Sequence, residues 1–378
     1  MEESVKSPIG WAKVKQILKD NAVLIIAIIA AAVTSIIVPP DKEYLGYFDF
    51  KTLACLFCVL AVVCALRNIR FFYTLAKAIV RKFRNTKIAI LVLVYITFIG
   101  SMLIANDMAL LTFLPLGYFI LHTTKKEKYL AFAFIMQNIA ANLGGMLTPF
   151  GNPQNLYLYS KFNIPDGEFV MIMLPPFIVA VVLITACCLI FVKSEPLEIQ
   201  EKAASMPVWR VVVYLVLFLL AIAMVFRFMP YQIGLIIIPI AILILDRQAL
   251  AQVDYGLLLT FVFFFIFAGN MGRIEAVRSF FSYLLSINTL VFSAMSCQFI
   301  SNVPSAILLS QFTDNYKELL LGVNIGGAGT LIASLASLIT FKEYSKQDPG
   351  HTVRYVLKFT AFNFAFLIIL TLFCYLIQ

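Results

Sequence analysis

Two stretches rich in Gly and Asn interrupt long apolar runs, one in each half of the chain. The first, residues 138–155, reads NIAANLGGMLTPFGNPQN and carries no charge. The second, residues 324–337, reads NIGGAGTLIASLAS, and a shift of 182 positions places Asn324 on Asn142. A bilayer cannot satisfy free backbone N–H and C=O groups, so such breaks occur only where protein or a polar cavity surrounds them. Matching interrupted helices in two halves of a chain are typical of the binding site of a secondary transporter.

The composition places these interruptions in a membrane. Among 378 residues, 62% are hydrophobic and only 13% are charged, about half the charged share of a typical soluble domain. The net charge of +9 does not indicate nucleic acid, because the basic residues lie in short loops beside apolar spans, where they report membrane orientation. The sequence therefore predicts an all-α polytopic membrane protein with the lipid bilayer, and no nucleic acid, as a partner.

The apolar segments and their interruptions predict two inverted repeats with about nine crossings and two re-entrant hairpins, joined by a cytoplasmic linker at 193–207. The first repeat, 1–192, is expected to contain these elements: scaffold 22–68, interfacial helix 69–86, hairpin 88–121, broken helix 128–162 and span 169–192. The second repeat, 208–378, is expected to contain scaffold 208–270, hairpin 288–312, broken helix 315–342 and span 352–376.

The distribution of Lys and Arg predicts the orientation. A cytoplasmic N-terminus puts the following basic segments inside: 1–21, 67–87, 125–128, 193–210 and 342–358. It leaves the acidic loops 41–51, 166–168 and 314–318 outside, as the positive-inside rule requires. Counting crossings then puts the C-terminus outside a cell (inner or plasma) membrane.

Asp107 is the single charged side chain in the two hairpins and the cores of the two broken helices. A carboxylate inside a membrane is costly unless a cation, a proton or strong donors meet it, so it is a functional candidate. The alternative is structural, because Asp107 opens the second arm of its hairpin and could cap that helix, as Asn302 could in the other hairpin. Both readings stay open from the sequence.

The remaining polar residues at the interruptions are neutral. They are Ser101, Asn106, Thr148, Asn152, Gln154, Asn155, Ser301, Asn302, Ser305, Thr330, Ser334 and Ser337. Their oxygens and unwound carbonyl groups suit Na⁺, while the N-termini of half-helices aim partial positive charge at an anion. No Lys or Arg stands in this core to neutralise an anion, so we expect coupling to Na⁺ or H⁺. Alternatively, some of these residues only satisfy broken backbone hydrogen bonds.

The hairpin tips read Ala105-Asn106-Asp107 and Ser301-Asn302-Val303, and the unwound loops cover 148–155 and 330–337. In these motifs the chain resembles the ion transporter superfamily, which includes divalent anion/sodium symporters, citrate transporters, arsenite efflux pumps and NhaD-like sodium/proton antiporters. In its length it is similar to small, poorly defined anion permeases of that superfamily.

The resemblance implies specific residues for each ligand. One cation site would consist of Ser101, Ala105, Asn106 and Gly151, and a second of Cys297, Ser301, Asn302 and Ala333. The substrate would lie between them and bind Asn106, Asn152, Asn302 and Ser334. Independently of the resemblance, the intramembrane carboxylate of Asp107 is a further candidate cation ligand, and Thr148 and Thr330 of the unwound loops are further candidates for the substrate. The family architecture implies a homodimer in which a mobile domain slides against the scaffold, an elevator type of alternating access.

Two positions differ from the dicarboxylate carriers, and they bear on which branch of the superfamily the chain resembles. Those carriers have Thr at the positions of Asp107 and Val303, and an Asn-Asp tip is more similar to the arsenite and NhaD-like branches. The leading hypothesis is transport of a small anion, for example a di- or tricarboxylate, coupled to Na⁺ or H⁺. The alternatives are arsenite or antimonite efflux and Na⁺/H⁺ antiport by Asp107.

Other classes of protein fit the sequence less well. A channel would use similar hairpins, but a selectivity filter normally repeats around an axis rather than in two facing copies. The core holds no Ser/His, His-rich or paired-Asp arrangement, so an enzyme is not expected. The seven Cys lie in apolar runs and only two His are present, so we expect no cofactor and no metal beyond Na⁺.

Overall fold

The computed structural model describes residues 22–197 and 207–377, whose regular secondary structure is helical apart from one isolated bridge between Asn85 and Pro196. Among these residues, seven helices are long and apolar enough to cross a membrane. The predicted all-α polytopic membrane fold is therefore confirmed. The predicted basic lead at 1–21 and residues 198–206 of the predicted linker lie outside the described residues.

In both halves a helical hairpin is followed by a broken helix and then by a long final helix. The first half contains α2 (Ala22–Ile37), α3 (Phe50–Asn68), α4 (Phe71–Val80), α5 (Thr86–Ile104), α6 (Asn106–Thr123), α7 (Leu130–Gly144), α8 (Pro153–Lys161) and α9 (Asp166–Phe191). The second contains α10 (Val208–Val225), α11 (Tyr231–Leu245), α12 (Arg247–Ala251), α13 (Tyr255–Arg273), α14 (Glu275–Ile287), α15 (Thr289–Ile300), α16 (Asn302–Leu309), α17 (Tyr316–Ile325), α18 (Leu335–Gln347) and α19 (Thr352–Ile377). Thus α5 and α6 correspond to α15 and α16, and α7 and α8 to α17 and α18.

Each hairpin turns at one residue with positive φ. Ala105 joins α5 to α6 at φ 68° and ψ 154°, and Ser301 joins α15 to α16 at φ 75° and ψ 159°. Neither residue is glycine, and backbone of this kind costs about 1–3 kcal/mol per residue and clusters at functional sites. The same strained geometry precedes Asn106 and Asn302, so both tips are built alike.

The broken helices resume from an equally similar conformation. α8 begins at Pro153, which suits a first helical position because it has no N–H to leave unpaired. The preceding Asn152 is extended at φ −140° and ψ 144°, and Ser334, directly before α18, has φ −150° and ψ 151°. The chain therefore unwinds and restarts in the same way at positions 182 apart.

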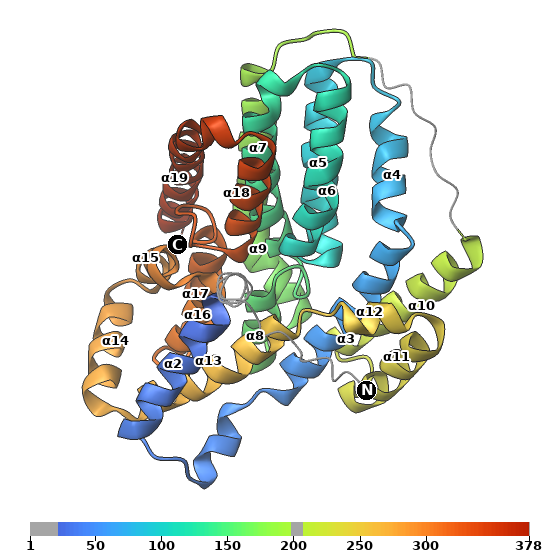
Figure 1. The fold of residues 1–378 in the computed structure, drawn as a ribbon. Coiled ribbons are helices and arrows are strands. Elements are labelled where there is room, and N and C mark those ends of the chain that lie inside the picture. Colours follow the sequence, from blue (N-terminus) through green and yellow to red (C-terminus); the bar gives the residue numbers. More distant parts are fainter. Residues whose placement is uncertain (1–21, 198–206, 378) are drawn as a thin grey trace, which may run out of the picture.

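The two halves pack across one another. α6 lies on α18 and α16 lies on α8, while α5 packs on α7 and α15 on α17. In addition, α2 packs on α13, and α3 packs on α10 and α11, while α13 also contacts α16 and α3 also contacts α8. Figure 1 shows α5, α6 and α7 side by side in the upper part of the molecule, with α3, α10, α11 and α13 below them. The ends of the interrupted helices thus meet between the two parts.

Within the predicted interfacial helix, 69–86, the structure has the shorter helix α4, which lies alongside α5 and α6 (Figure 1). Its side chains Phe72, Ala76 and Val80 are buried, while Leu75 is exposed. The amphipathic pattern therefore covers a face of the first hairpin. Its position at a membrane surface stays a prediction.

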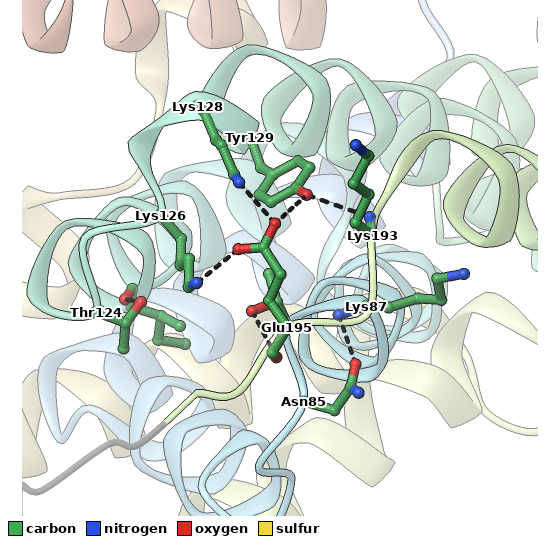
Figure 2. A network of polar contacts seen from close by, with 10 residues as sticks. Asn85, Lys87, Thr124, Lys126, Lys128, Tyr129, Lys193 and Glu195 are labelled. Carbon is green, nitrogen blue, oxygen red and sulfur yellow. Dashed lines mark hydrogen bonds and ion pairs between the residues drawn. The ribbon is translucent and has the colours of Figure 1, made fainter.

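The segment that follows α9 is attached to the loops of the first half through Glu195 (Figure 2). Its carboxylate accepts hydrogen bonds from Lys126 and Lys128, each at 2.6 Å, and from the Tyr129 hydroxyl at 3.0 Å. Its backbone carbonyl accepts from the N–H of Thr86 at 2.9 Å. One residue therefore ties the start of the linker to the α6–α7 loop and to the beginning of α5.

Candidate substrate and cation site

Four helix N-termini lie at the interruptions. α6 and α16 begin at the hairpin tips, and α8 and α18 begin where the broken helices resume. The backbone N–H of Asn302 donates to the carbonyl oxygen of Ala333, two residues before α18, at 2.9 Å. A helix N-terminus carries about half a positive charge on its free N–H groups. The tips and restarts together therefore supply positive partial charge without a lysine or arginine at these points.

Buried amides connect the first hairpin to its broken helix. The Nδ2 of Asn106 donates to Oδ1 of Asn142 at 3.1 Å, and the Nδ2 of Asn152 donates to the backbone carbonyl of Asn142 at 3.3 Å. All three side chains are at most 5% exposed. Asn142 therefore joins the hairpin tip to the point where α8 begins.

Hydrogen bonds between amide side chains connect the two halves at Asn324. Its Oδ1 accepts from Nδ2 of Asn152 at 3.3 Å and from Nε2 of Gln154 at 3.4 Å, and its Nδ2 donates to Oδ1 of Asn155 at 2.6 Å. The Nδ2 of Asn155 in turn donates to the carbonyl groups of Gly145, Met146 and Thr148. Asn155 thus satisfies the carbonyl groups freed by the first interruption, while Asn324 links the two interruptions.

Gly327 lies between the two hairpin tips. A Cβ atom added at this glycine would lie 3.2 Å from Nδ2 of Asn302 and 3.5 Å from Oδ1 of Asn142, the atom that accepts from Asn106. Both tip asparagines therefore reach the same small region. Because glycine has no side chain, the unwound backbone can approach both of them closely.

Three buried oxygen atoms of the site have no hydrogen-bond partner: Oδ1 of Asp107, Oδ1 of Asn152 and Oε1 of Gln154. The two amide orientations are fixed, because both nitrogen atoms already donate to acceptors. An unpaired buried acceptor costs about 1–3 kcal/mol and calls for a proton donor, a water or an ion. Oxygen atoms of this kind are suitable ligands for Na⁺.

Asp107 does not cap α6. The side chain that accepts at this turn is that of Asn106, whose Oδ1 accepts from the backbone N–H of Asp107 at 3.0 Å, and the cap position itself is Ala105. In the other hairpin, Asn302 likewise accepts from the N–H of Val303 at 2.9 Å. The capping alternative is therefore wrong for Asp107, which is 5% exposed and leaves Oδ1 unpaired.

The second predicted cation set is brought into contact. The Oγ of Ser301 donates to the carbonyl of Ala333 at 3.3 Å, Asn302 donates its backbone N–H to the same carbonyl, and the N–H of Ser301 donates to the carbonyl of Cys297. The thiol of Cys297 donates to the carbonyl of Ser293. The candidate ligands here are therefore one hydroxyl oxygen, one amide oxygen and backbone carbonyl groups.

The residues of the first predicted cation set, Ser101, Ala105, Asn106 and Gly151, are connected through neighbouring residues rather than by direct hydrogen bonds to one another. The Oγ of Ser101 donates to the carbonyl of Phe98 at 2.8 Å, and a Cβ atom on Gly144 would lie 2.6 Å from that Oγ. A Cβ atom on Gly151 would lie 2.3 Å from the carbonyl oxygen of Gly145. The close approach at Gly144 packs the end of α7 against the hairpin arm that carries Ser101, and the one at Gly151 packs the unwound loop against its own Gly145. Ala105 can contribute only its backbone.

The two predicted substrate-binding threonines make matching backbone contacts. The hydroxyl of Thr148 donates to the carbonyl of Met102 on α5 at 2.7 Å, and the hydroxyl of Thr330 donates to the carbonyl of Gln298 on α15 at 3.1 Å. Each hydroxyl proton is therefore used to hold an unwound loop against the first arm of its hairpin. Ser334 is used locally, since its Oγ lies 2.9 Å from that of Ser337 and accepts from the Ser337 N–H.

Several buried or partly buried amides near the site were not predicted. The Nε2 of Gln298 donates to the carbonyls of Ala294, Gly326 and Ala328. On the other side, Asn138 donates to Oδ1 of Asn363 on α19 at 3.3 Å. The sequence could have identified Asn138 and Asn142, because they lie in the repeated stretch. It could not have identified Gln298 and Asn363, since each is an isolated amide in an apolar helix.

Comparison with known proteins identifies this architecture. A family model described as citrate transporter matches residues 11–316. The chain belongs to the citrate transporter family. An uncharacterized transporter of Methanocaldococcus jannaschii is 32% identical over 301 residues, which cover 79% of this chain and 82% of that protein. The inner membrane protein YbiR of Escherichia coli is 27% identical over 311 residues, which cover 80% and 82% of the two chains.

Membership of the citrate transporter family agrees with the geometry. The chain is a multi-pass membrane protein whose partners include the lipid bilayer and a small substrate, and a transporter rather than an enzyme is what the family implies. The superfamily expected from the hairpin and loop motifs is thereby confirmed.

Proposed function

We propose that this protein transports a small multivalent anion, such as a di- or tricarboxylate, coupled to Na⁺ or H⁺. The observation that carries the proposal is the meeting of four helix N-termini and a cluster of neutral amides from both halves. Such N-termini bind anions through free N–H groups and the helix dipole. The description of the matching family as a citrate transporter supports a carboxylate.

Coupling to a cation follows from the charges at the site. An anion entering beside the Asp107 carboxylate would meet repulsion unless a cation or a proton neutralised the site first. The unpaired oxygens of Asp107, Asn152 and Gln154 could accept either. The ion would bind among the two predicted cation sets, and the substrate beside Asn106, Asn152, Asn302 and Ser334.

The arrangement of the helices also supports a mode of transport. We propose that the hairpins and broken helices move together against a scaffold of α2, α3, α10, α11 and α13, in a homodimer with a cytoplasmic N-terminus. The packing of α3 on α10 and α11 and of α2 on α13 supports this division. The strained tips at Ala105 and Ser301 would stay with the moving part.

Labelled citrate and succinate tested in proteoliposomes would check the proposal. Uptake driven by an imposed Na⁺ or pH gradient is the expected result, and substitution of Asn106 and Asn302 by Ala should abolish it. A second candidate, Na⁺/H⁺ antiport, is favoured by the unpaired Oδ1 of Asp107. Exchange of Na⁺ for H⁺ without any added anion would establish antiport and overturn symport.

A further inference from the structure

Two arginines at the junction of α3 and α4 line a cavity separate from the amide cluster. Arg67 lies in the last turn of α3, and Arg70 precedes α4 at φ 55°. The cavity has a volume of about 360 Å³, and its other walls include Tyr73 of α4 and Leu111 and Thr112 of α6. Small-molecule sites occupy cavities of about 300–1,000 Å³, so a small organic anion would fit.

Neither guanidinium is neutralised within the described part of the chain. Arg67 contacts the Met108 sulfur at 3.6 Å and Oε1 of Gln252 at 3.5 Å, and both of these partners are uncharged. Among the ion pairs of the described residues, none includes Arg67 or Arg70. Two unpaired guanidinium groups on one cavity favour a ligand that carries more than one carboxylate or phosphate oxygen.

The carboxylates on the turns around this end of α3 are engaged elsewhere. Asp246 accepts from the side chain of Asn68 at 3.0 Å and from the N–H of Ala249, and Asp254 accepts from the N–H of Leu257 at 2.8 Å. Both aspartates therefore begin helices, α12 and α13. They leave the cavity with a positive charge that no side chain in contact with it balances.

The cavity adjoins the middle of α6, one to two helical turns beyond the hairpin tip where the amide cluster starts. Leu111 lies one helical turn beyond Asp107, and residues four apart share a helix face. Arg67 contacts Met108, the residue next to Asp107. An anion in the cavity would therefore be about two helical turns from the tip asparagine Asn106.

We propose that Arg67 and Arg70 form a second anion site, which holds the transported anion at the α3–α4 end of the route to the hairpin tips. This inference rests on the proposed function, because it assigns the same anion to a waiting position. In the predicted orientation this end faces the cytoplasm. The guanidinium groups attract the anion electrostatically, and the tips, which carry no cationic side chain, then receive it together with the coupling cation.

The second half offers a matched control. A cavity of about 430 Å³ lies between α14 and the end of α16, the helices that correspond to α4 and α6, and it is lined by Arg278 together with Asp314. One arginine beside one aspartate leaves no net charge there. Arg278→Gln therefore removes an arginine from a comparable place without removing the proposed site.

The experiment measures citrate binding by calorimetry in phosphatidylcholine nanodiscs, in potassium buffer without sodium. The protein carries Asn106→Ala and Asn302→Ala, which remove the central contacts. We expect this parent to bind citrate, and the added pair Arg67→Gln and Arg70→Gln to weaken binding about tenfold or more. Arg278→Gln should leave it unchanged. Arg67→Lys with Arg70→Lys keeps the charges but not the bidentate geometry, so it should bind citrate more weakly than the parent and more tightly than the Gln pair.

Other results would contradict the proposed second site or the proposed function. A parent that binds no citrate, or a Gln pair that binds as tightly as the parent, would overturn the second site. Phosphatidylglycerol retained by the parent and lost from the Gln pair in native mass spectrometry, with no citrate binding, would assign the cavity to lipid phosphate and also overturn it. The proposed function fails separately, when the unsubstituted protein transports no anion in proteoliposomes.

Discussion

Asn152 and Asn324 share a hydrogen bond of 3.3 Å although they stand 172 positions apart, one in each half of the chain. Asn152 directly precedes α8, and Asn324 lies in the last turn of α17. The bond therefore joins the restart of one broken helix to the end of the first segment of the other. Neither half can complete this cluster alone, so stability and transport should depend on the same few amides.

Asn324→Ala should be strongly destabilising, because it leaves the buried amides of Asn152, Gln154 and Asn155 without their shared partner. We expect a loss of about 3 kcal/mol in unfolding free energy, measured by denaturant titration in detergent, and loss of anion uptake. Asn270→Ala is the control, since Asn270 is buried on α13 and donates to Thr34 and Ser35. Asn270→Ala should lower the unfolding free energy but leave anion uptake and its KM unchanged. If Asn270→Ala impaired uptake as much as Asn324→Ala does, the assignment of Asn324 to the transport site would be contradicted.

Thr148→Val and Thr330→Val test whether these hydroxyls bind substrate or hold the loops. Because each donates to a backbone carbonyl of a hairpin arm, removing it should cost about 1 kcal/mol of stability. The KM for the anion should change little, while the maximal rate falls as the loops loosen. A KM raised tenfold at unchanged stability would instead place the hydroxyl on the substrate.

The sequence predicted the structure best at the interruptions, where both halves carry the same residue types because the same breaks in a membrane helix must be satisfied. Gly, Asn and Pro at both interruptions predicted unwound helices, and Asn106 and Asn302 were correctly placed at two tips that reach one region. The partners of single amides could not be predicted, because the direction of a side chain such as Gln298 or Asn363 depends on how distant helices pack. The role of Asp107 was equally open, since a carboxylate at a helix start caps or stays free according to its rotamer.

Gly329→Ala should loosen the second interruption. Gly329 has φ 134°, and a Cβ atom there would lie 2.0 Å from Oε1 of Gln298, which accepts from the N–H of Thr330. Backbone strain alone costs about 1–3 kcal/mol, so the melting temperature and uptake should both fall. Gly46→Ala is the matched control, because a Cβ atom at Gly46 has nothing within 4 Å. A variant at Gly329 that melts like the Gly46 variant would refute the steric argument.

Glu195 gives a prediction for acid stability outside the membrane. Hydrogen bonds from Lys126, Lys128 and Tyr129 lower the pKa of its carboxyl from 4.5 to about 2. A depressed folded-state pKa means that the stabilisation is fully present above pH 4.5 and is lost as the pH falls toward 2. Glu195→Gln should therefore melt below the wild type at neutral pH, and the difference should shrink through this acid window. Glu127→Gln, whose carboxylate is exposed and pairs with His122, is the control that should show much less change.

Asp107→Asn separates coupling from folding. Because Oδ1 of Asp107 has no hydrogen-bond partner and the residue caps nothing, an amide of the same shape should leave the melting temperature nearly unchanged or slightly raised. The substitution removes the one carboxylate at the hairpin tip that can hold a cation or a proton, so the dependence of uptake on the Na⁺ or H⁺ gradient should disappear. Flux measured in proteoliposomes with each gradient imposed in turn gives the answer. Gradient-driven uptake that persists at the wild-type rate would move the coupling ion to the neutral oxygens of Ser301, Asn302 and Ala333, where no charged group is needed.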